Sequence, residues 1–111
     1  MAERDVALTE AIASGSALDR WLAVLSDGDR RELIRHLASG TTAHEATIGE
    51  LAFAIGVSRF SASRHVQVLR QVGLVVTRKV GNRVLVHLVD EPLRIIDDWV
   101  GGVVDALATT A

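Results

Sequence analysis

The side chains best suited to chemistry lie along a predicted helix at residues 58–71, where arginine, glutamine and serine recur. Projected at about 100° per residue, this helix gathers Ala62, Val66, Leu69 and Val72 on one side, which is therefore its core face. Arginine can donate to N7 and O6 of guanine and glutamine pairs with adenine, while serine and lysine more often bind phosphates. The opposite side carries Phe60, Ser63, Arg64, Gln67 and Gln71, with Arg59 and Arg70 along one flank. These residue types predict that this side contacts base edges in a major groove.

The distribution of charge supports this prediction, although the net charge does not. The 111-residue chain has a formal net charge of only −2, yet residues 51–89 contain no Asp or Glu and hold six of its twelve Lys and Arg residues. A solvated helix face or a protected sheet edge would explain either basic feature alone. Together, in the order helix-turn-helix and then basic hairpin, they favour binding to double-stranded DNA. The candidate DNA-contact residues are Ser58, Arg59, Phe60, Ser61, Ser63, Arg64, His65, Gln67, Arg70, Arg78, Lys79, Asn82 and Arg83.

Capping and turn signals indicate the elements that position these side chains. Ser16 and Thr47 each begin a capping box, the run from Ser26 repeats the pattern, and Ser58 can cap the helix that carries the arginines. Gly81-Asn82 predicts a two-residue turn between two valine-rich, alternating segments. The polar residues 41–46 are expected to form a loop. The expected elements are helices at 3–14 and about 17–25, one that ends at Ser39-Gly40, helices at 47–55 and 58–71, strands at 74–79 and 83–89, and a closing helix at about 92–108.

This order predicts a mainly α fold with a small β-hairpin (α+β), a winged helix-turn-helix. Residues 1–111 are expected to form one domain, with a recognition helix at about 58–71 and a wing at about 74–89. The absence of cysteine excludes disulfides, thiolate metal sites and cysteine nucleophiles. No nucleophile motif or glycine-rich phosphate loop is present, so the protein is not expected to be an enzyme. Without a signal peptide or a spanning run of roughly 18–20 apolar residues, a cytoplasmic protein with no membrane partner is expected.

Residues at about 17–108, above all the run at 49–89, resemble the ArsR/SmtB family of bacterial winged helix-turn-helix repressors. The resemblance rests on the run GELAFAIGVS, on Ser63, Arg64, His65 and Leu69 in the recognition helix, on Gly73-Leu74-Val75 after it, and on the family's LSD-x-x-R segment at 24–31. It implies a homodimer built on the helices at about 17–25 and 92–108, which binds a near-palindromic operator as a transcriptional repressor and is released by a ligand. Apolar residues suited to that dimer interface are Leu18, Trp21, Leu22, Leu25, Ile96, Trp99, Val100, Val103 and Leu107.

The chain departs from the metal-sensing relatives of that family. Many of them carry cysteines in the helix before the recognition helix, whereas residues 50–55 read ELAFAI here, so this helix is expected only to pack. Others bind zinc between the closing helices through Asp and His, and the closing helix here has no His. Neither a metal nor a cofactor is therefore expected. A residual metal-ligand pattern, also common on solvated helices, is Asp29, Glu32 and His36 on one helical face. The inducer is a small organic molecule, a metal held by carboxylates, or absent.

Several interpretations stay open at this level. His65 either contacts a phosphate or is a semi-buried histidine, because it projects to the flank of the core face. Phe60 either contacts a thymine methyl or, as the preferred interpretation, packs against a neighbouring loop. Trp21 and Trp99 belong either to the dimer interface or to the core of one subunit. The alternative function is that of a winged-helix module that binds a protein partner and no DNA.

Overall fold

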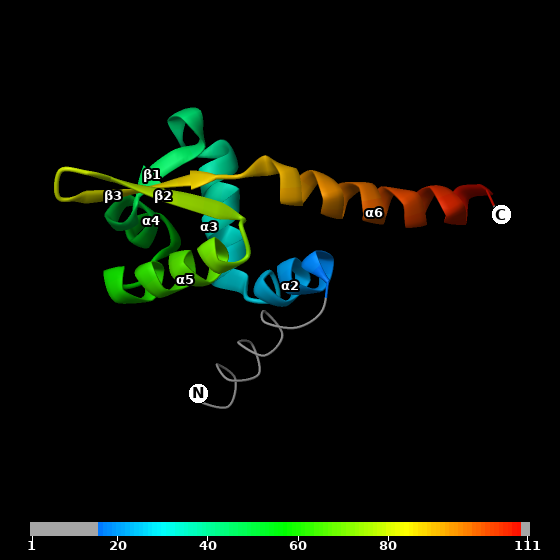
Figure 1. Ribbon diagram of the computed structural model, residues 1–111, viewed down its shortest axis with the longest axis horizontal. Coiled ribbons are helices and arrows are strands. Elements are labelled where there is room, and N and C mark those ends of the chain that lie inside the picture. The colour runs from blue at the N-terminus through cyan, green and yellow to red at the C-terminus, as the bar shows by residue number, and fades with distance from the viewer. Residues whose placement is uncertain (1–15, 110–111) are drawn as a thin grey trace, which may run out of the picture.

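The computed structural model describes residues 16–109, and the helix expected at residues 3–14 lies outside them. A helix-turn-helix is followed by a β-hairpin, so the predicted winged fold class is confirmed (Figure 1). No helix in the described part of the chain is both long enough and apolar enough to cross a membrane. The elements are α2 Ala17–Val24, α3 Gly28–Ser39, the short 3-10 helix Thr42–His44, β1 Glu45–Thr47, α4 Ile48–Ile55, α5 Arg59–Gln71, β2 Val75–Val80, β3 Arg83–Leu88 and α6 Asp90–Thr109.

Side-chain caps set where the first two described helices begin. The capping box predicted at Ser16 is present, with the Ser16 hydroxyl accepting from the amide of Asp19 at 3.2 Å. The box predicted from Ser26 is wrong, because Asp27 is the N-cap of α3 and accepts from the amide of Arg30 at 3.1 Å. Ser26 instead lies just beyond α2, and its hydroxyl donates to the carbonyl of Ala23 in that helix.

The helix-turn-helix consists of α4 and α5. Gly56 ends α4 with a φ of 72°, a left-handed conformation that a residue without a Cβ adopts at little cost. The amide of Val57 then donates to the carbonyl of Ala52 at 3.0 Å, which completes the turn. Ser58 caps α5 as predicted, because its hydroxyl accepts from the amide of Ser61 at 3.0 Å. These local bonds determine the direction in which α5 leaves the turn.

The wing belongs to a three-stranded antiparallel sheet with the strand order β1-β3-β2. β2 and β3 form the predicted hairpin, in which Val80 lies opposite Arg83 across the Gly81-Asn82 turn. The loop expected at residues 41–46 is wrong at its end, because Glu45–Thr47 is a strand that pairs with β3. Three residues are too few to show an alternation, and the partner strand lies far along the chain, so no local pattern signals this pairing.

The core holds α5 by its apolar side. The side predicted to face the core is buried there, and the sheet contributes its inner face, so the polar side of α5 is turned outward. Burial of such side chains provides most of the favourable free energy of folding. The core comprises Val24, Leu33, Ile34, Leu37, Ala46, Leu51, Val66, Leu69, Val72, Leu74, Val75, Val86 and Leu88, with Ala62 also buried.

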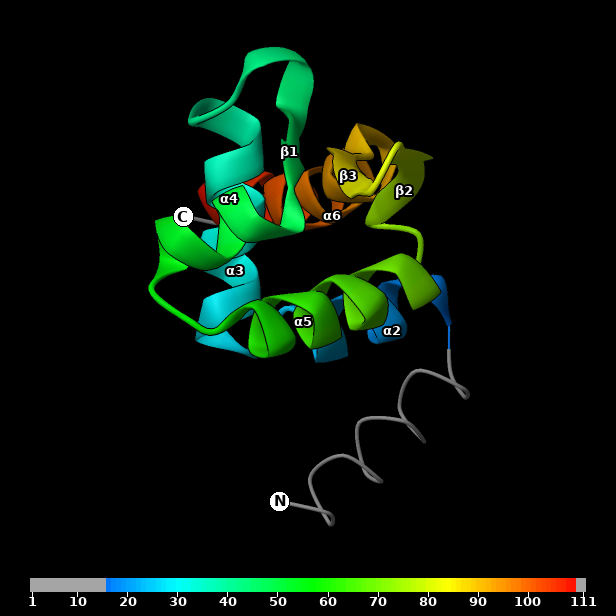
Figure 2. The ribbon, with the colours of Figure 1, turned by 90° about the vertical axis from the view of Figure 1, so that its left-hand side faces the viewer.

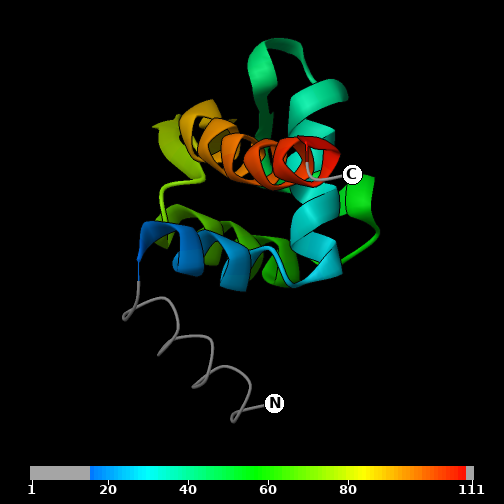
Figure 3. The same ribbon diagram turned by 90° about the vertical axis from the view of Figure 1, so that its right-hand side faces the viewer.

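The closing helix α6 projects away from this body (Figures 1 and 3). Pro92 is its only buried residue, and Leu93 packs against the core. α2 contacts α6, and both lie on the side of the molecule away from the wing tip. Beyond its first turn, α6 therefore carries apolar surface that no described residue of the chain covers. The exposed apolar residues on it are Ile95, Trp99, Val100, Val103, Val104 and Leu107.

Candidate nucleic-acid interface

The predicted contact side of α5 lies open to solvent. The helix runs across the face of the molecule below the sheet, and the wing tip is on the same face (Figure 2). Ser61 is half-buried, and His65 turns inward, as described below. The exposed members of the predicted set on α5 and its cap are Ser58, Arg59, Phe60, Ser63, Arg64, Gln67 and Arg70.

Two aromatic rings of the helix-turn-helix are exposed. Phe60, on α5, is 78% exposed, so the preferred expectation that it packs against a loop is wrong. Phe53, on α4, is 90% exposed, so the expectation that this helix only packs is wrong at that residue. Its place off the apolar stripe of α4 was the signal that sequence reasoning missed. A large apolar side chain in water is the informative exception to burial, so both rings are available to a partner.

Strand alternation divides the basic residues of the wing between two faces. Thr77 pairs with the buried Val86, so this side of the sheet is the inner one, toward the helices. Lys79, two residues beyond Thr77, lies on the inner side as well. Arg78 and Arg83 lie on the outer side. At the tip, Lys79 and Arg83 therefore extend from opposite faces of the hairpin.

Arg78 is held by a carboxylate outside the predicted segment. Its Nε donates to Oε2 of Glu45 at 3.2 Å and its Nη2 donates to Oε1 at 2.9 Å. The hydrogen bond from Arg78, followed by the charges of Arg78 and His87, keeps the pKa of Glu45 below its ordinary value despite some desolvation. The same hydrogen bond raises the pKa of Arg78. Glu45 precedes the carboxylate-free segment, so only the sheet brings this pair together.

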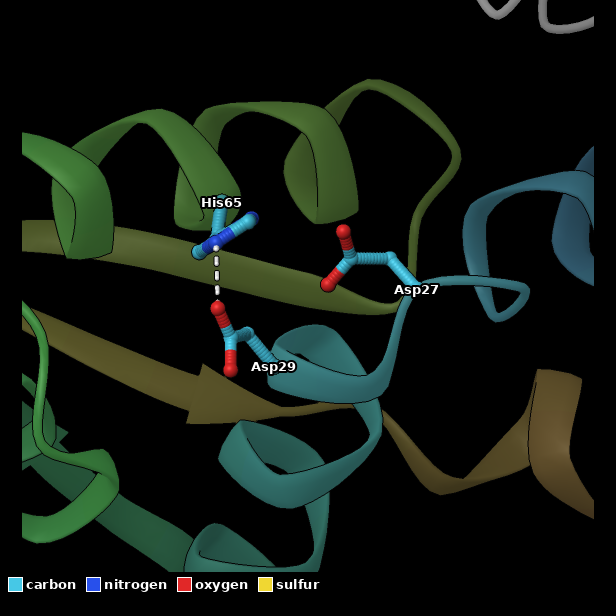
Figure 4. Close-up of side chains that lie close together, drawn as sticks. All are labelled: Asp27, Asp29 and His65. Carbon is cyan, nitrogen blue, oxygen red and sulfur yellow. Dashed lines mark ion pairs between the residues drawn. The ribbon is translucent and has the colours of Figure 1, made fainter.

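His65 turns inward from α5 toward the start of α3 (Figure 4). Its side chain is 15% exposed, and its Nε2 lies 3.7 Å from Oδ2 of Asp29. Its Nδ1 lies 3.4 Å from Nη1 of Arg30, a buried arginine whose Nε donates to the carbonyl of Val24 at 2.6 Å. Of the two interpretations of His65, the semi-buried histidine describes its position in the structure. It links the recognition helix to α3.

Asp27, Asp29 and His65 place one ligand atom each within 4.8 Å of one another, a spacing compatible with a metal ion. Arg30 argues against that use. Its guanidinium is a permanent cation 3.9 Å from Oδ2 of Asp27, and it faces Nδ1 of His65. When Nδ1 accepts from Arg30, the neutral ring carries its hydrogen on Nε2, which then faces Asp29 without a lone pair for a metal. We therefore interpret the cluster as a polar contact between α3 and α5.

The residual metal pattern at Asp29, Glu32 and His36 does not assemble. The carboxylate of Asp29 lies beside His65, on α5. Glu32 instead pairs with Arg35, one of its oxygens lying 3.6 Å from Nε of the arginine. Helical spacing placed the three residues on one face, but the packing of α5 against α3 gave Asp29 a different partner.

The cap residue of α3 predicts a dependence of stability on pH. Burial acts to raise the pKa of Asp27, but the amide of Arg30 and the charges of Arg30 and His65 outweigh it, so the pKa is lowered. A lowered pKa in the folded state means that this stabilisation is present above the ordinary pKa and is lost as pH falls through the folded value. We expect the free energy of unfolding to decrease as the pH is lowered from about 4. Asp27→Asn, which keeps a capping oxygen, should show a smaller decrease. Urea denaturation across this range measures it; an unaltered pH profile in Asp27→Asn would contradict the assignment.

The predicted dimer residues separate into a packed group and an exposed group. Nε1 of Trp21 donates to the carbonyl of Val72 at 2.8 Å, and Trp21 and Leu25 pack against the core of the same chain. Leu18 and Ile96 are half-buried, and Leu22 is exposed. Trp99 is 55% exposed, and Ile95 and Val104, which sequence reasoning missed, are exposed beside it. An open groove of about 660 Å³ on α6 is lined by Asp98, Trp99, Gly102, Val103, Ala106 and Leu107.

Comparison with known proteins matches the part of the chain that holds the helix-turn-helix. A family model described as a helix-turn-helix domain matches residues 25–78. The HTH-type transcriptional regulator Rv2034 of Mycobacterium tuberculosis is 42% identical over 65 residues, which cover 59% of this chain and 57% of that protein. The match thus spans little more than half the length of that relative.

Solved structures extend the likeness to most of the chain. The crystal structure of an ArsR family transcriptional regulator matches with a TM-score of 0.71 at 24% identity, over 84% of this chain and 98% of that one. The solution structure of the homodimeric winged helix-turn-helix DNA-binding domain of Mb0332 from Mycobacterium bovis, a possible ArsR-family regulator, matches with a TM-score of 0.61. The identity is 27%, over 92% of this chain and 85% of that one.

Proposed function

Because the chain belongs to the ArsR family of winged helix-turn-helix transcriptional regulators, we propose that it is a dimeric, sequence-specific DNA-binding repressor. The family is a class of DNA-binding regulators and not of enzymes. The observation that carries the proposal is the exposed side of α5, where Ser63, Arg64 and Gln67 face solvent on a helix held by its core side. Such a helix can present donors and acceptors to DNA while its packing stays intact.

In the proposed complex, α5 lies in the major groove of B-DNA, which is about 12 Å wide and admits a helix. Ser63, Arg64 and Gln67 meet base edges, and the exposed ring of Phe60 meets a thymine methyl group. The remaining contacts are made to phosphates, which position the protein without reading sequence. These come from Ser58, Arg59, Ser61 and Arg70 on the helix and from Lys79, Asn82 and Arg83 on the wing. His65 and Arg78 are left out of this set, because each is engaged with residues of its own chain.

The apolar side of α6 supports the proposed dimer. It is exposed in the single chain, and the related domain from Mycobacterium bovis is homodimeric. A two-fold dimer would present its two recognition helices to a near-palindromic operator with half-sites about 34 Å, or a multiple of this, apart. Because the chain has no cysteine, we propose that its release signal acts without thiol chemistry, through a small organic inducer. A metal ion retained by the purified protein would contradict that part of the proposal.

Salt dependence provides the test of DNA binding. We expect the protein to bind duplex DNA from upstream of its own coding sequence, with log affinity falling linearly as log salt rises. Each phosphate that the protein neutralises should add about −0.9 to the slope, because binding releases condensed counterions. Fluorescence anisotropy at several salt concentrations measures the slope. Absence of binding, or a slope near zero, would rule the proposal out.

A second function, a module that binds a protein partner through the helix-turn-helix, is favoured by one observation. Phe53 and Phe60 expose aromatic rings on α4 and α5, and such rings are common anchors of protein interfaces. The variant Arg64→Ala with Arg83→Ala separates the two functions. A DNA-binding regulator loses affinity for DNA in this variant, whereas an interaction module has no DNA affinity to lose and keeps its partner.

A further inference from the structure

The outer face of the sheet carries an ion pair that the proposed DNA contacts do not use. Glu45 on β1 lies opposite His87 on β3, and His87 lies opposite Val76 on β2. Arg78 is two residues beyond Val76 and therefore extends from the same face. Since β3 lies between β1 and β2, the side chain of Arg78 crosses the middle strand to reach Glu45. It is thereby drawn toward β1, away from the wing tip.

The pair uses the atoms with which an arginine binds phosphate. Nε and Nη2 donate to the two carboxylate oxygens of Glu45 at 3.2 and 2.9 Å, a bidentate arrangement. The same parallel pair of N–H groups matches two oxygens of a phosphate. While Glu45 occupies them, Arg78 cannot make the same contact with DNA. The carboxylate also offsets the charge of Arg78 toward any phosphate that approaches the wing.

The surroundings of the pair leave it open to exchange. The side chain of Arg78 is 61% exposed, and that of Glu45 is 22% exposed. His87 Nδ1 lies 4.0 Å from Oε2 of Glu45 and is the other titratable group close to this carboxylate in the described sheet. An ion pair this accessible to water is held weakly, so a closely spaced row of phosphates can compete for its arginine.

We propose that Glu45 limits the affinity of the wing for duplex DNA by occupying the bidentate donor groups of Arg78. The inference rests on the proposed function, because it concerns the phosphate backbone that the same surface would bind. Arg78 then binds a phosphate only when its ion pair with Glu45 breaks. Glu45 is a positioning residue for the wing and does not itself touch DNA.

Glu45→Gln tests this with a side chain of nearly the same shape and no charge. Binding to a short random-sequence duplex, measured by anisotropy, should become tighter, and the salt slope should steepen by about 0.9, the value for one added phosphate contact. The gain in affinity of Glu45→Gln over the wild type should therefore be about 3.5-fold larger at about 50 mM salt than at about 200 mM salt. A slope equal to that of the wild type, or weaker binding, would overturn the proposal.

Two controls separate release of Arg78 from a general effect of charge. In an Arg78→Ala background, Glu45→Gln should leave the slope unchanged relative to Arg78→Ala alone. If it steepens the slope there as well, the proposal is overturned. Glu91→Gln, which removes an exposed carboxylate from the first turn of α6, should leave the wild-type slope unchanged; an equal steepening would also overturn it.

The proposal has a readout that needs no variant. In the free wild-type protein, the NMR signal of the Nε hydrogen of Arg78 should shift when the duplex is added. A signal that the duplex leaves unchanged would count against the proposal. If the wild type binds no duplex at all, the proposed function fails. If the wild type binds with a salt-dependent affinity and Glu45→Gln behaves like it, only this inference fails.

Discussion

Trp99→Glu is expected to convert the proposed dimer to a monomer and to weaken binding to a two-half-site operator by on the order of 100- to 10,000-fold. Trp99 is 55% exposed in the single chain and lines the groove on α6. A carboxylate at its position would be buried without a partner in the dimer, at a high cost in free energy. In the monomer it would face water, so the fold should persist. Loss of the dimer removes the second half-site contact, which otherwise binds at a high effective concentration.

Analytical ultracentrifugation and operator binding measure the two effects separately. Arg94→Ala serves as the matched control, because it removes only an exposed ion pair with Asp90 from the same helix, outside the groove. It should leave both the mass and the affinity unchanged. A Trp99→Glu protein that keeps the dimer mass would show that this side of α6 is not the interface.

Leu69→Ala should lower the free energy of unfolding by about 2–5 kcal/mol, because a small side chain leaves a cavity in a close-packed core. Leu69 is fully buried, on the core side of α5, and the amide of Leu74 donates to its carbonyl at 3.0 Å. The loss is a large part of the roughly 5–15 kcal/mol that stabilises a domain. Urea denaturation, fitted with an unchanged slope, measures it directly.

Val76→Ala is the control for this second prediction, since Val76 lies on the outer face of the sheet and is exposed. Its cost should stay below about 1 kcal/mol. Equal losses in the two variants would mean that α5 is not held by its apolar side. In that case the separation of a packed side from a DNA-facing side, on which the proposed complex depends, would fail.

Sequence reasoning reached most of the fold because the signals involved are local. Ser58 begins α5 and Gly56 ends α4 through bonds to residues within a few positions, so a short window of sequence contains both partners. The alternation of valines and the Gly81-Asn82 turn predicted the hairpin for the same reason. The exception among the local signals is Ser26, where two adjacent residues could cap α3 and Asp27 became the cap.

The sequence could not show which residues from distant parts of the chain each of these side chains contacts. Strand β1 was missed because three residues carry no periodicity, and without it Glu45 has no visible relation to Arg78. Phe60 was misplaced because a helical projection shows which side a ring is on, but not whether a loop comes to cover it. His65 stayed undecided because its partners, Asp29 and Arg30, lie on another helix.

The sequence alone thus determined the order of the described α-helices and of the hairpin, the polar side of α5 and the chemistry offered there, because capping, turns and helical periodicity act between near neighbours. The tertiary structure decided how the charged groups on this surface are paired and oriented. Arg78 is engaged by Glu45, and Lys79 and Arg83 lie on opposite faces of the wing. These contacts depend on strand register and helix packing between segments remote in the chain, and no local pattern contains that information.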